Sequence, residues 1–162
     1  MAIRPATADD LPAIGDILNA AILEGTASWR CSAYTADELA GWFATKQAAG
    51  TVRLMFTGGA VAGVSAAGAF RAGEGYALTR EHSVYVASAL RGRGFGTALL
   101  SDIVDWARAA GYHRLVGGVS ADQPASLALH RRLGFTEAGR LEQVGRKNGR
   151  WLDLVLMMRV LD

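Results

Sequence analysis

Arg91-Gly92-Arg93-Gly94-Phe95-Gly96 is the stretch of sequence that decides the fold. The apolar residues 83–86 precede it, and a segment with helical periodicity, residues 97–110, follows it. Three alternate glycines let a ligand approach the backbone closely, because no Cβ stands in the way. Their amides, with the unpaired amides of the first helical turn, predict an anion site flanked by Arg91 and Arg93. A strand, a Gly/Arg turn and a helix in this order indicate a pyrophosphate site.

The bulk composition limits the class of protein. The chain has 162 residues, of which 51% are hydrophobic and 20% charged, so residues 1–162 are expected to form a single folded domain. A net charge of +2 is too small and too scattered to indicate a nucleic-acid partner. The single cysteine, Cys31, excludes an internal disulfide and is typical of a reducing compartment.

Targeting signals are absent from the sequence pattern. The first residues lack the apolar segment of a signal peptide, and no apolar run approaches the roughly 20 residues that span a bilayer. We therefore expect a cytoplasmic protein that has no membrane partner.

Periodicity and turn residues predict a mixed α/β sheet with the order β-α-α-β-β-β-α-β-α-β-β. The helices are expected to begin at Thr7, Thr35, Thr97 and Pro124. The strands are expected at residues 2–4, 52–57, 60–69, 83–87, 115–119, 135–144 and 151–160. Gly58-Gly59 predicts a tight hairpin between the second and third strands.

The glycine turn does not match the common nucleotide-binding signatures. A dinucleotide fingerprint needs G-x-G-x-x-G within a βαβ unit, whereas this turn has G-x-G-x-G after strands that form a meander. A Walker A loop would need Gly-Lys-Ser/Thr, which the turn lacks. Coenzyme A, with its diphosphate and 3′-phosphate, fits amides and arginines at a helix end. The alternative is that the two arginines only solvate a surface turn.

The residues resemble the GCN5-related N-acetyltransferase (GNAT) superfamily. The turn 91–96 is similar to its acetyl-CoA signature, R/Q-x-x-G-x-G/A, and residues 126–135 resemble the second hallmark, the helix and turn beside the pantetheine. Residues 81–86 and 144–153 resemble the phosphinothricin and methionine sulfoximine acetyltransferase branch. The resemblance implies a GNAT fold with about seven strands, flanking helices and a splay between the fourth and fifth strands. It also implies acetyl-CoA as cosubstrate, no metal, and a homodimer.

The same resemblance assigns the residues that bind acetyl-CoA. The strand contributes the backbone groups of Val84, Tyr85 and Val86, and an amide there faces the acetyl oxygen as negative charge develops on it. Gln123 replaces the usual pantetheine-contacting asparagine, with the same amide on a longer stem next to Pro124. The other cosubstrate residues are Arg91, Gly92, Arg93, Gly94, Phe95, Gly96, Thr97 and Ser126.

Acyl transfer requires an unprotonated amine, and an α-amine with a pKa near 8 is mostly ammonium at neutral pH. Glu81 matches the proposed base of the family; alternatively, it is a surface glutamate in a salt bridge. His82 points to the opposite face of the strand and reads as structural. His130 stands where many relatives have a tyrosine that protonates the thiolate, although a thiol of pKa about 8.5 leaves without help.

Substrate recognition is expected to use arginine, because a bidentate guanidinium suits a carboxylate. The resemblance places Arg71 near the substrate pocket, and Arg80 is a second candidate. Phe70, Tyr76 and Trp29 either wall this pocket or belong to the core. Lys147 and Trp151 resemble a segment that contributes to the dimer and the neighbouring pocket; a plain hairpin turn explains them equally well.

The predicted function is acetyl-CoA-dependent acetylation of the α-amine of a small amino-acid analogue such as methionine sulfoximine, methionine sulfone or phosphinothricin. Direct transfer in a ternary complex is expected, because Cys31 has no histidine nearby in sequence to activate it. Two alternatives stay open. The enzyme could acetylate another small amine or a protein N-terminus, or the chain could be a non-catalytic sensor that binds acyl-CoA.

Overall fold

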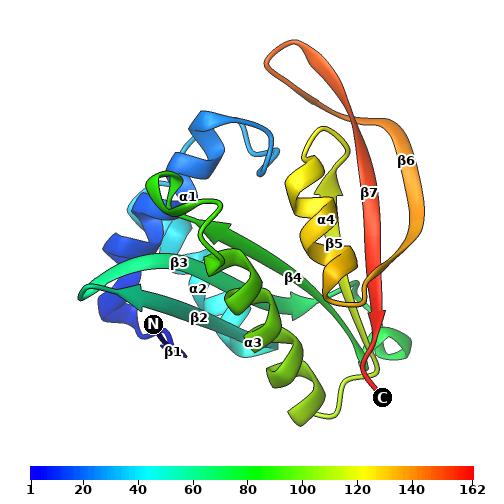
Figure 1. Ribbon diagram of the computed structural model, residues 1–162, viewed down its shortest axis with the longest axis horizontal. Helices are drawn as coiled ribbons and strands as arrows, with labels where there is room; N and C mark the ends of the chain where they lie inside the picture. Colours follow the sequence, from blue (N-terminus) through cyan, green and yellow to red (C-terminus); the bar gives the residue numbers. More distant parts are fainter.

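A seven-stranded mixed sheet runs through the computed structural model, which describes residues 1–162 (Figure 1). Its strand order is β1-β2-β3-β4-β5-β7-β6, and only β4 and β5 are parallel neighbours. The predicted fold class is confirmed. The strands are β1 (Ala2–Pro5), β2 (Thr51–Thr57), β3 (Ala60–Ala69), β4 (Thr79–Val86), β5 (Arg114–Ser120), β6 (Thr136–Lys147) and β7 (Arg150–Val160).

The predicted splay lies between β4 and β5. The two strands pair from Thr79 opposite Arg114 to His82 opposite Gly117, and then they separate. Beyond this point β4 pairs only with β3 and β5 only with β7. The facing edges of residues 83–86 and 118–120 therefore have no strand partner, and their backbone polar groups are available to a ligand.

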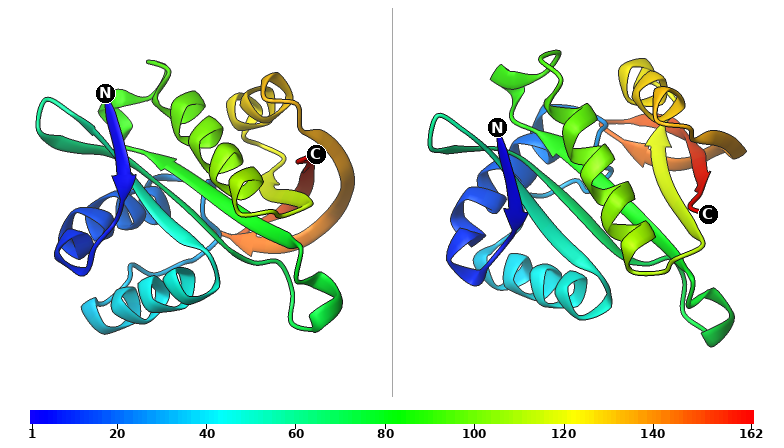
Figure 2. Two further views of the ribbon diagram at one scale, coloured as in Figure 1. Left: turned by 90° about the horizontal axis from the view of Figure 1, so that it is seen from below. Right: turned by 60° about the horizontal axis from the view of Figure 1, so that its bottom comes forward.

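Four α-helices cover the two faces of the sheet: α1 (Leu11–Glu24), α2 (Ala36–Ala49), α3 (Phe95–Ala109) and α4 (Pro124–Arg132). Figure 2 shows α1 and α2 on one face and α3 on the other. A capping box starts α2: the Thr35 amide donates to Glu38 Oε2 at 2.9 Å and the Glu38 amide to Thr35 Oγ1 at 3.3 Å. No helix has the length and apolar character needed to cross a membrane.

The apolar stripes of the helices build the core and thereby fix the position of the site. Helices α1 and α2 pack Ile14 and Leu39 against Leu54 and neighbouring residues of β2 and β3. Helix α3 packs Leu100 and Ile103 into a second cluster with residues of β5 and β7. Burying a side chain of this size contributes about 1.5–3 kcal/mol, so these contacts hold α3 firmly against the sheet.

The glycine-rich turn has a backbone conformation that requires glycine at two positions. Gly92 and Gly94 have φ angles of 75° and 86°, a region that side chains with a Cβ avoid, and Gly94 is the N-cap of α3. The first backbone hydrogen bond of the helix runs from the Ala98 amide to the Gly94 carbonyl at 3.1 Å. The amides of residues 95–97 therefore have no helical acceptor, as an anion site requires.

Two hairpins differ in how they end. Gly58 and Gly59 both have positive φ, which confirms the predicted tight turn between β2 and β3. Strands β6 and β7 are longer than predicted and are joined only by Asn148-Gly149, also with positive φ at both residues. This hairpin rises beyond the helices at the upper right of Figure 1, and β6 is an edge strand.

Candidate active site

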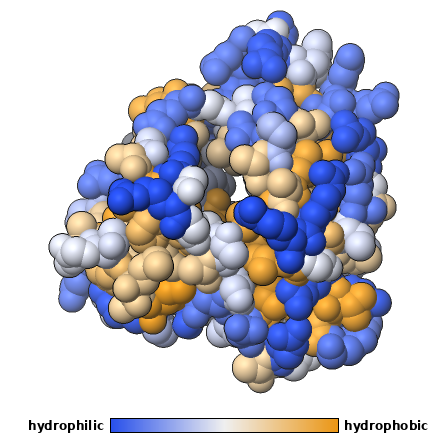
Figure 3. Space-filling model, viewed as in Figure 1, coloured by the Kyte–Doolittle hydropathy of each residue, from blue (hydrophilic) through white to orange (hydrophobic).

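A larger and a smaller cavity meet at the splay. The larger, of about 920 Å³, lies between β4, β5, the start of α3 and α4; the smaller, of about 340 Å³, lies beside the α1–α2 loop and α2. Figure 3 shows the hollow between the two halves of the molecule. Both cavities are lined by His82, Ser83, Tyr85 and Gly118. Two ligands can therefore approach the same short segment of β4 from different cavities.

The larger cavity brings together most of the predicted acetyl-CoA residues. Val84, Tyr85, Val86, Arg91, Gly92, Gly94, Gly96, Thr97, Gln123 and Ser126 line it. Arg93 is exposed outside the lining. The Phe95 side chain is buried in a core cluster with Met55 and Leu99, so only its backbone amide is available at the turn.

Charge at the mouth of the larger cavity suits an anionic ligand. Arg91 lines it, and its guanidinium Nη2 lies 3.3 Å from Glu24 Oε2 in an exposed ion pair. Exposed pairs of this kind contribute little, so the arginine can exchange this carboxylate for a ligand at small cost. The unpaired amides and the positive end of the α3 dipole act in the same direction.

Gln123 already has a partner in this structure. Its side-chain amide donates to Thr26 Oγ1 at 2.8 Å, and the Thr26 hydroxyl donates to Asp122 Oδ1 at 2.7 Å. Ser120 donates to the same carboxylate oxygen at 2.7 Å. These bonds tie the α1–α2 loop to the β5–α4 loop where the two cavities meet, a link that the sequence did not reveal.

Glu81 is half-buried in the wall of the smaller cavity. Its Oε1 lies 3.7 Å from the position that a Cβ on Gly118 would take, so the carboxylate reaches across to β5. Burial raises the pKa of Glu81, while the charges of Lys46 and Arg71 oppose the rise. Glu81 enters none of the ion pairs of the fold, so the alternative of a salt-bridged surface glutamate is not what the structure shows.

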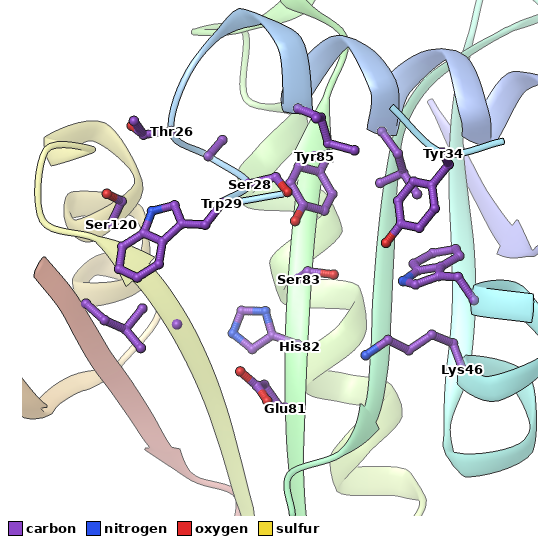
Figure 4. A pocket seen from close by; sticks show the side chains of 16 residues that line it. Thr26, Ser28, Trp29, Tyr34, Lys46, Glu81, His82, Ser83, Tyr85 and Ser120 are labelled. Carbon is purple, nitrogen blue, oxygen red and sulfur yellow. The ribbon is translucent and has the colours of Figure 1, made fainter. Parts of the chain in front are cut away.

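Figure 4 shows the side chains that face the smaller cavity. Trp29, a predicted wall residue, lines it, together with Tyr34 and Lys46, which sequence reasoning missed. Lys46 stands near the end of α2, where a lysine reads as a favourable charge for the helix dipole. Only the tertiary structure shows that it faces Glu81. Burial raises the pKa of Tyr85, so its hydroxyl stays a neutral hydrogen-bond donor.

The other predicted substrate residues do not line either cavity. Phe70 and Tyr76 pack edge to face at 5.9 Å on the β3–β4 loop, and the Arg71 guanidinium lies 5.2 Å from the Phe70 ring centre. Arg71 is exposed, although its charge acts on Glu81. Arg80 donates to the carbonyls of residues 77 and 79 and stacks on Tyr112 at 4.1 Å, away from the cavities.

Lys147 is buried behind the α1–α2 loop. Its Nζ donates to the carbonyl oxygens of Ile22, Gly25 and Ser28, each at 2.6 Å, and the residue is only 4% exposed. The β6–β7 hairpin approaches the same loop at Gly145, where a Cβ would stand 2.3 Å from the Trp29 ring. Lys147 therefore holds the loop that carries Trp29, and it reaches neither cavity directly.

His82 and His130 form a buried stacked pair, with ring centres 5.1 Å apart. The His130 Nδ1 donates to the Ser126 carbonyl at 2.7 Å, so in the neutral ring Nε2 carries a lone pair and no proton. Burial lowers the pKa of His130 and lowers that of His82 to about 3. This arrangement favours a positioning role for His130; the general-acid role stays a prediction.

A sheet that splays beside a glycine-rich helix start, with the Glu81 carboxylate in the smaller of two adjoining cavities, is the arrangement expected of a group transferase that binds a phosphate-bearing cosubstrate beside its acceptor. Residues 16–135 match the model of the acetyltransferase (GNAT) family, and the chain belongs to this family. It is an N-acetyltransferase. The predicted family is thereby confirmed.

The relatives are similar over almost their full length. The L-methionine sulfoximine/L-methionine sulfone acetyltransferase of Salmonella typhimurium is 40% identical, over 100% of this chain and 95% of the relative. The L-amino acid N-acyltransferase MnaT of Escherichia coli is 41% identical with the same coverage. The structure of a phosphinothricin acetyltransferase from Sinorhizobium meliloti in complex with acetyl-CoA superposes with a TM-score of 0.95 at 36% identity, covering 99% of this chain and 88% of that chain. The resemblance to this branch is confirmed.

Proposed function

We propose that this enzyme transfers an acetyl group from acetyl-CoA to the α-amine of a small amino-acid analogue of the methionine sulfoximine, methionine sulfone or phosphinothricin type. The observation that carries the proposal is the meeting of the two cavities at residues 82–85, with Glu81 in the wall of the smaller one. The names of the relatives support this choice of substrate.

The residues of the larger cavity fit acetyl-CoA. The unpaired amides at the start of α3 and the Arg91 guanidinium suit its diphosphate. The open edges of β4 and β5 offer backbone donors and acceptors to the amides of a pantetheine chain. When bound, the cosubstrate supplies the activated acetyl group. We assign its binding to the residues predicted from the sequence, except that the Phe95 side chain belongs to the core and Arg93 lies outside the cavity.

Glu81 acts as the base in this proposal. Its carboxylate accepts a proton from the substrate ammonium group, directly or through one water, and thereby frees the nitrogen lone pair for attack. The attack forms the amide C–N bond and breaks the thioester C–S bond, and CoA leaves as a thiol with the second proton that the nitrogen loses. Partial burial raises the pKa of Glu81 and makes its carboxylate a stronger base than an exposed glutamate, while the positive charges of Lys46 and Arg71 oppose this rise. The backbone of residues 84–86 faces the splay, where an amide can stabilise developing oxyanion charge.

The same arrangement supports direct transfer in a ternary complex. The two cavities share a wall at β4, so amine and acetyl donor can be bound together. Cys31 is exposed and lines neither cavity, which leaves it without a role as an acyl carrier. The free thiol also supports a cytoplasmic location.

A homodimer is part of the proposal. The edge strand β6 is exposed along most of its length; its Leu141 and Val144 are 45% and 54% exposed, and Trp151 on the neighbouring β7 is 59% exposed. Apolar side chains on a long edge strand favour burial against a second copy. Light scattering should give twice the chain mass for the wild type and a lower mass for Val144→Glu.

An acceptor panel tests the proposed activity. CoA release from acetyl-CoA is measured with methionine sulfoximine, methionine sulfone, phosphinothricin, simple alkylamines and a peptide with a free N-terminus. Turnover is expected with the amino-acid analogues and not with alkylamines. Activity confined to the peptide would support a protein N-terminus as substrate. Acetyl-CoA binding without CoA release with any amine would indicate a sensor and refute the proposal.

A further inference from the structure

A lysine that no sequence motif assigns faces the catalytic carboxylate. Lys46 lies in α2 (Ala36–Ala49) and lines the smaller cavity together with Glu81. In Figure 4 its side chain extends from the helix toward β4, and its ammonium group points into the cavity. The cation and Glu81 come from different layers of the fold, one from a helix and one from the sheet.

The sheet leaves room for this side chain at one residue. Gly68 on β3 stands opposite Glu81 in the register of β3 and β4. A Cβ on Gly68 would lie 3.1 Å from Lys46 Cδ and 3.2 Å from its Nζ. The lysine therefore lies across the bare backbone of Gly68 and brings its charge beside the strand position that carries Glu81.

The ammonium group of Lys46 has no counterion within the fold. It enters none of the ion pairs, and the residue is only partly exposed. Glu81 lies near enough for the two charges to interact, yet the pair does not close to salt-bridge distance. A partly buried cation in a cavity wall, without a partner, is set up for an anionic group of a ligand.

We propose that Lys46 binds the α-carboxylate of the acceptor amino acid while Glu81 receives the proton of its α-amine. This inference rests on the proposed function and deepens it, because it names the residue that distinguishes a free amino acid from other amines. An α-amino acid carries an ammonium and a carboxylate on one carbon, and the cavity offers a carboxylate and an ammonium on adjacent walls. A peptide N-terminus or an alkylamine lacks the group that Lys46 would bind.

Arg71 is the rival for this role. It was predicted from the sequence, but it is exposed on the β3–β4 loop and does not line the cavity. The geometry therefore favours Lys46 as the residue in contact with the substrate and leaves Arg71 as a more distant charge. The two assignments predict different effects of the two substitutions.

The experiment compares methionine sulfone with its carboxamide, which keeps the amine and side chain and removes the carboxylate charge. Values of kcat/KM are measured for the wild type, Lys46→Met, Lys46→Arg and Arg71→Met. Arg131→Met, which removes a charge from an exposed residue outside both cavities, is the matched control. Because Lys46→Met removes a charged hydrogen bond, we expect its kcat/KM for methionine sulfone to be about 10- to 100-fold lower than that of the wild type. The kcat/KM of Lys46→Met for the carboxamide should differ from the wild-type value by less than about threefold. Lys46→Arg should keep part of the activity with methionine sulfone, because it keeps the positive charge.

A pH profile separates recognition from simple loss of structure. Removing the positive charge of Lys46 should raise the pKa of Glu81, which also lies beside Tyr85 and within the electrostatic reach of Arg71, and should move the acid limb of kcat/KM to higher pH. Circular dichroism and acetyl-CoA affinity should match the wild type. Equal losses for acid and carboxamide would overturn the inference, as would a selective loss in Arg71→Met alone. Absence of turnover in the wild type with every amino acid would instead refute the proposed function.

Discussion

Replacing Lys147 with methionine tests how the substrate loop is held. Methionine keeps most of the length of the stem and removes the ammonium group. In the wild type this group donates to three carbonyl oxygens, of Ile22, Gly25 and Ser28, each at 2.6 Å. All three belong to the end of α1 and the loop that follows it. The substitution leaves three acceptors without their donor at a site that is nearly closed to solvent.

The size of the effect follows from these contacts. A buried acceptor without a partner costs about 1–3 kcal/mol, and relaxation of the loop toward water recovers part of this cost. We expect Lys147→Met to lower the free energy of unfolding by about 3–5 kcal/mol. In a domain of this size 1 kcal/mol corresponds to about 2–4 °C in Tm, so the Tm should fall by roughly 6–20 °C.

Urea and thermal unfolding, monitored by circular dichroism, measure the change. Arg150→Met is the matched control, because Arg150 is a cation on the same hairpin whose side chain is 66% exposed and whose partner, Asp122, lies 3.4 Å away. Arg150→Met should lower the free energy of unfolding by less than about 1 kcal/mol. A Lys147→Met protein as stable as Arg150→Met would refute the view that the buried ammonium anchors the loop.

Three further predictions concern the sheet, the buried histidines and the cosubstrate site. Gly117→Ala places a Cβ 2.6 Å from His82 Nε2 and should lower the free energy of unfolding by about 1–3 kcal/mol in urea titrations. Gly41→Ala is the control: its Cβ would have no neighbour within 4 Å, so it should leave the free energy of unfolding unchanged or raise it. Burial lowers the pKa of His82 to about 3, so on acidification the unfolded chain binds a proton at this residue before the folded protein does. The free energy of unfolding should therefore be highest above about pH 6.5 and fall toward pH 3 by up to about 1.4 kcal/mol per pH unit. His82→Leu should reduce this slope in urea titrations at several pH values. Arg91→Met should weaken CoA binding about 10-fold by calorimetry and Arg93→Met less than about threefold, because only Arg91 lines the cavity; equal effects would contradict this assignment.

The turns could be predicted from the sequence, because their backbone conformation depends on a few neighbouring residues. The turn that the glycine spacing singled out has positive φ angles at Gly92 and Gly94, and the hairpin at Gly58-Gly59 forms as expected. The splay was expected from the resemblance and is visible in the register, which stops at His82. The fold class could thus be predicted from the sequence, and the resemblance to a known family added most of the wall of the larger cavity, apart from Arg93 and the Phe95 side chain.

Residues whose role depends on long side chains could not be assigned in this way. Lys147 was expected near a pocket, but its stem is long enough to reach the carbonyls of a loop more than a hundred residues earlier. Arg80 was a candidate for the substrate carboxylate, and it stacks on Tyr112 instead. Lys46 was missed because its position depends on the bare backbone of Gly68, which only the packing of α2 on β3 reveals.

The central claim, that Glu81 is the base for acetylation of an amino-acid amine, is tested most directly with Glu81→Gln. Glutamine is close to isosteric and cannot accept the proton. Single-turnover acetylation of methionine sulfone and acetyl-CoA affinity are measured on the same preparations of wild type and variant. We expect a loss of about 10²- to 10⁴-fold in the transfer rate with unchanged acetyl-CoA affinity. A variant that transfers acetyl at the wild-type rate near neutral pH would contradict it.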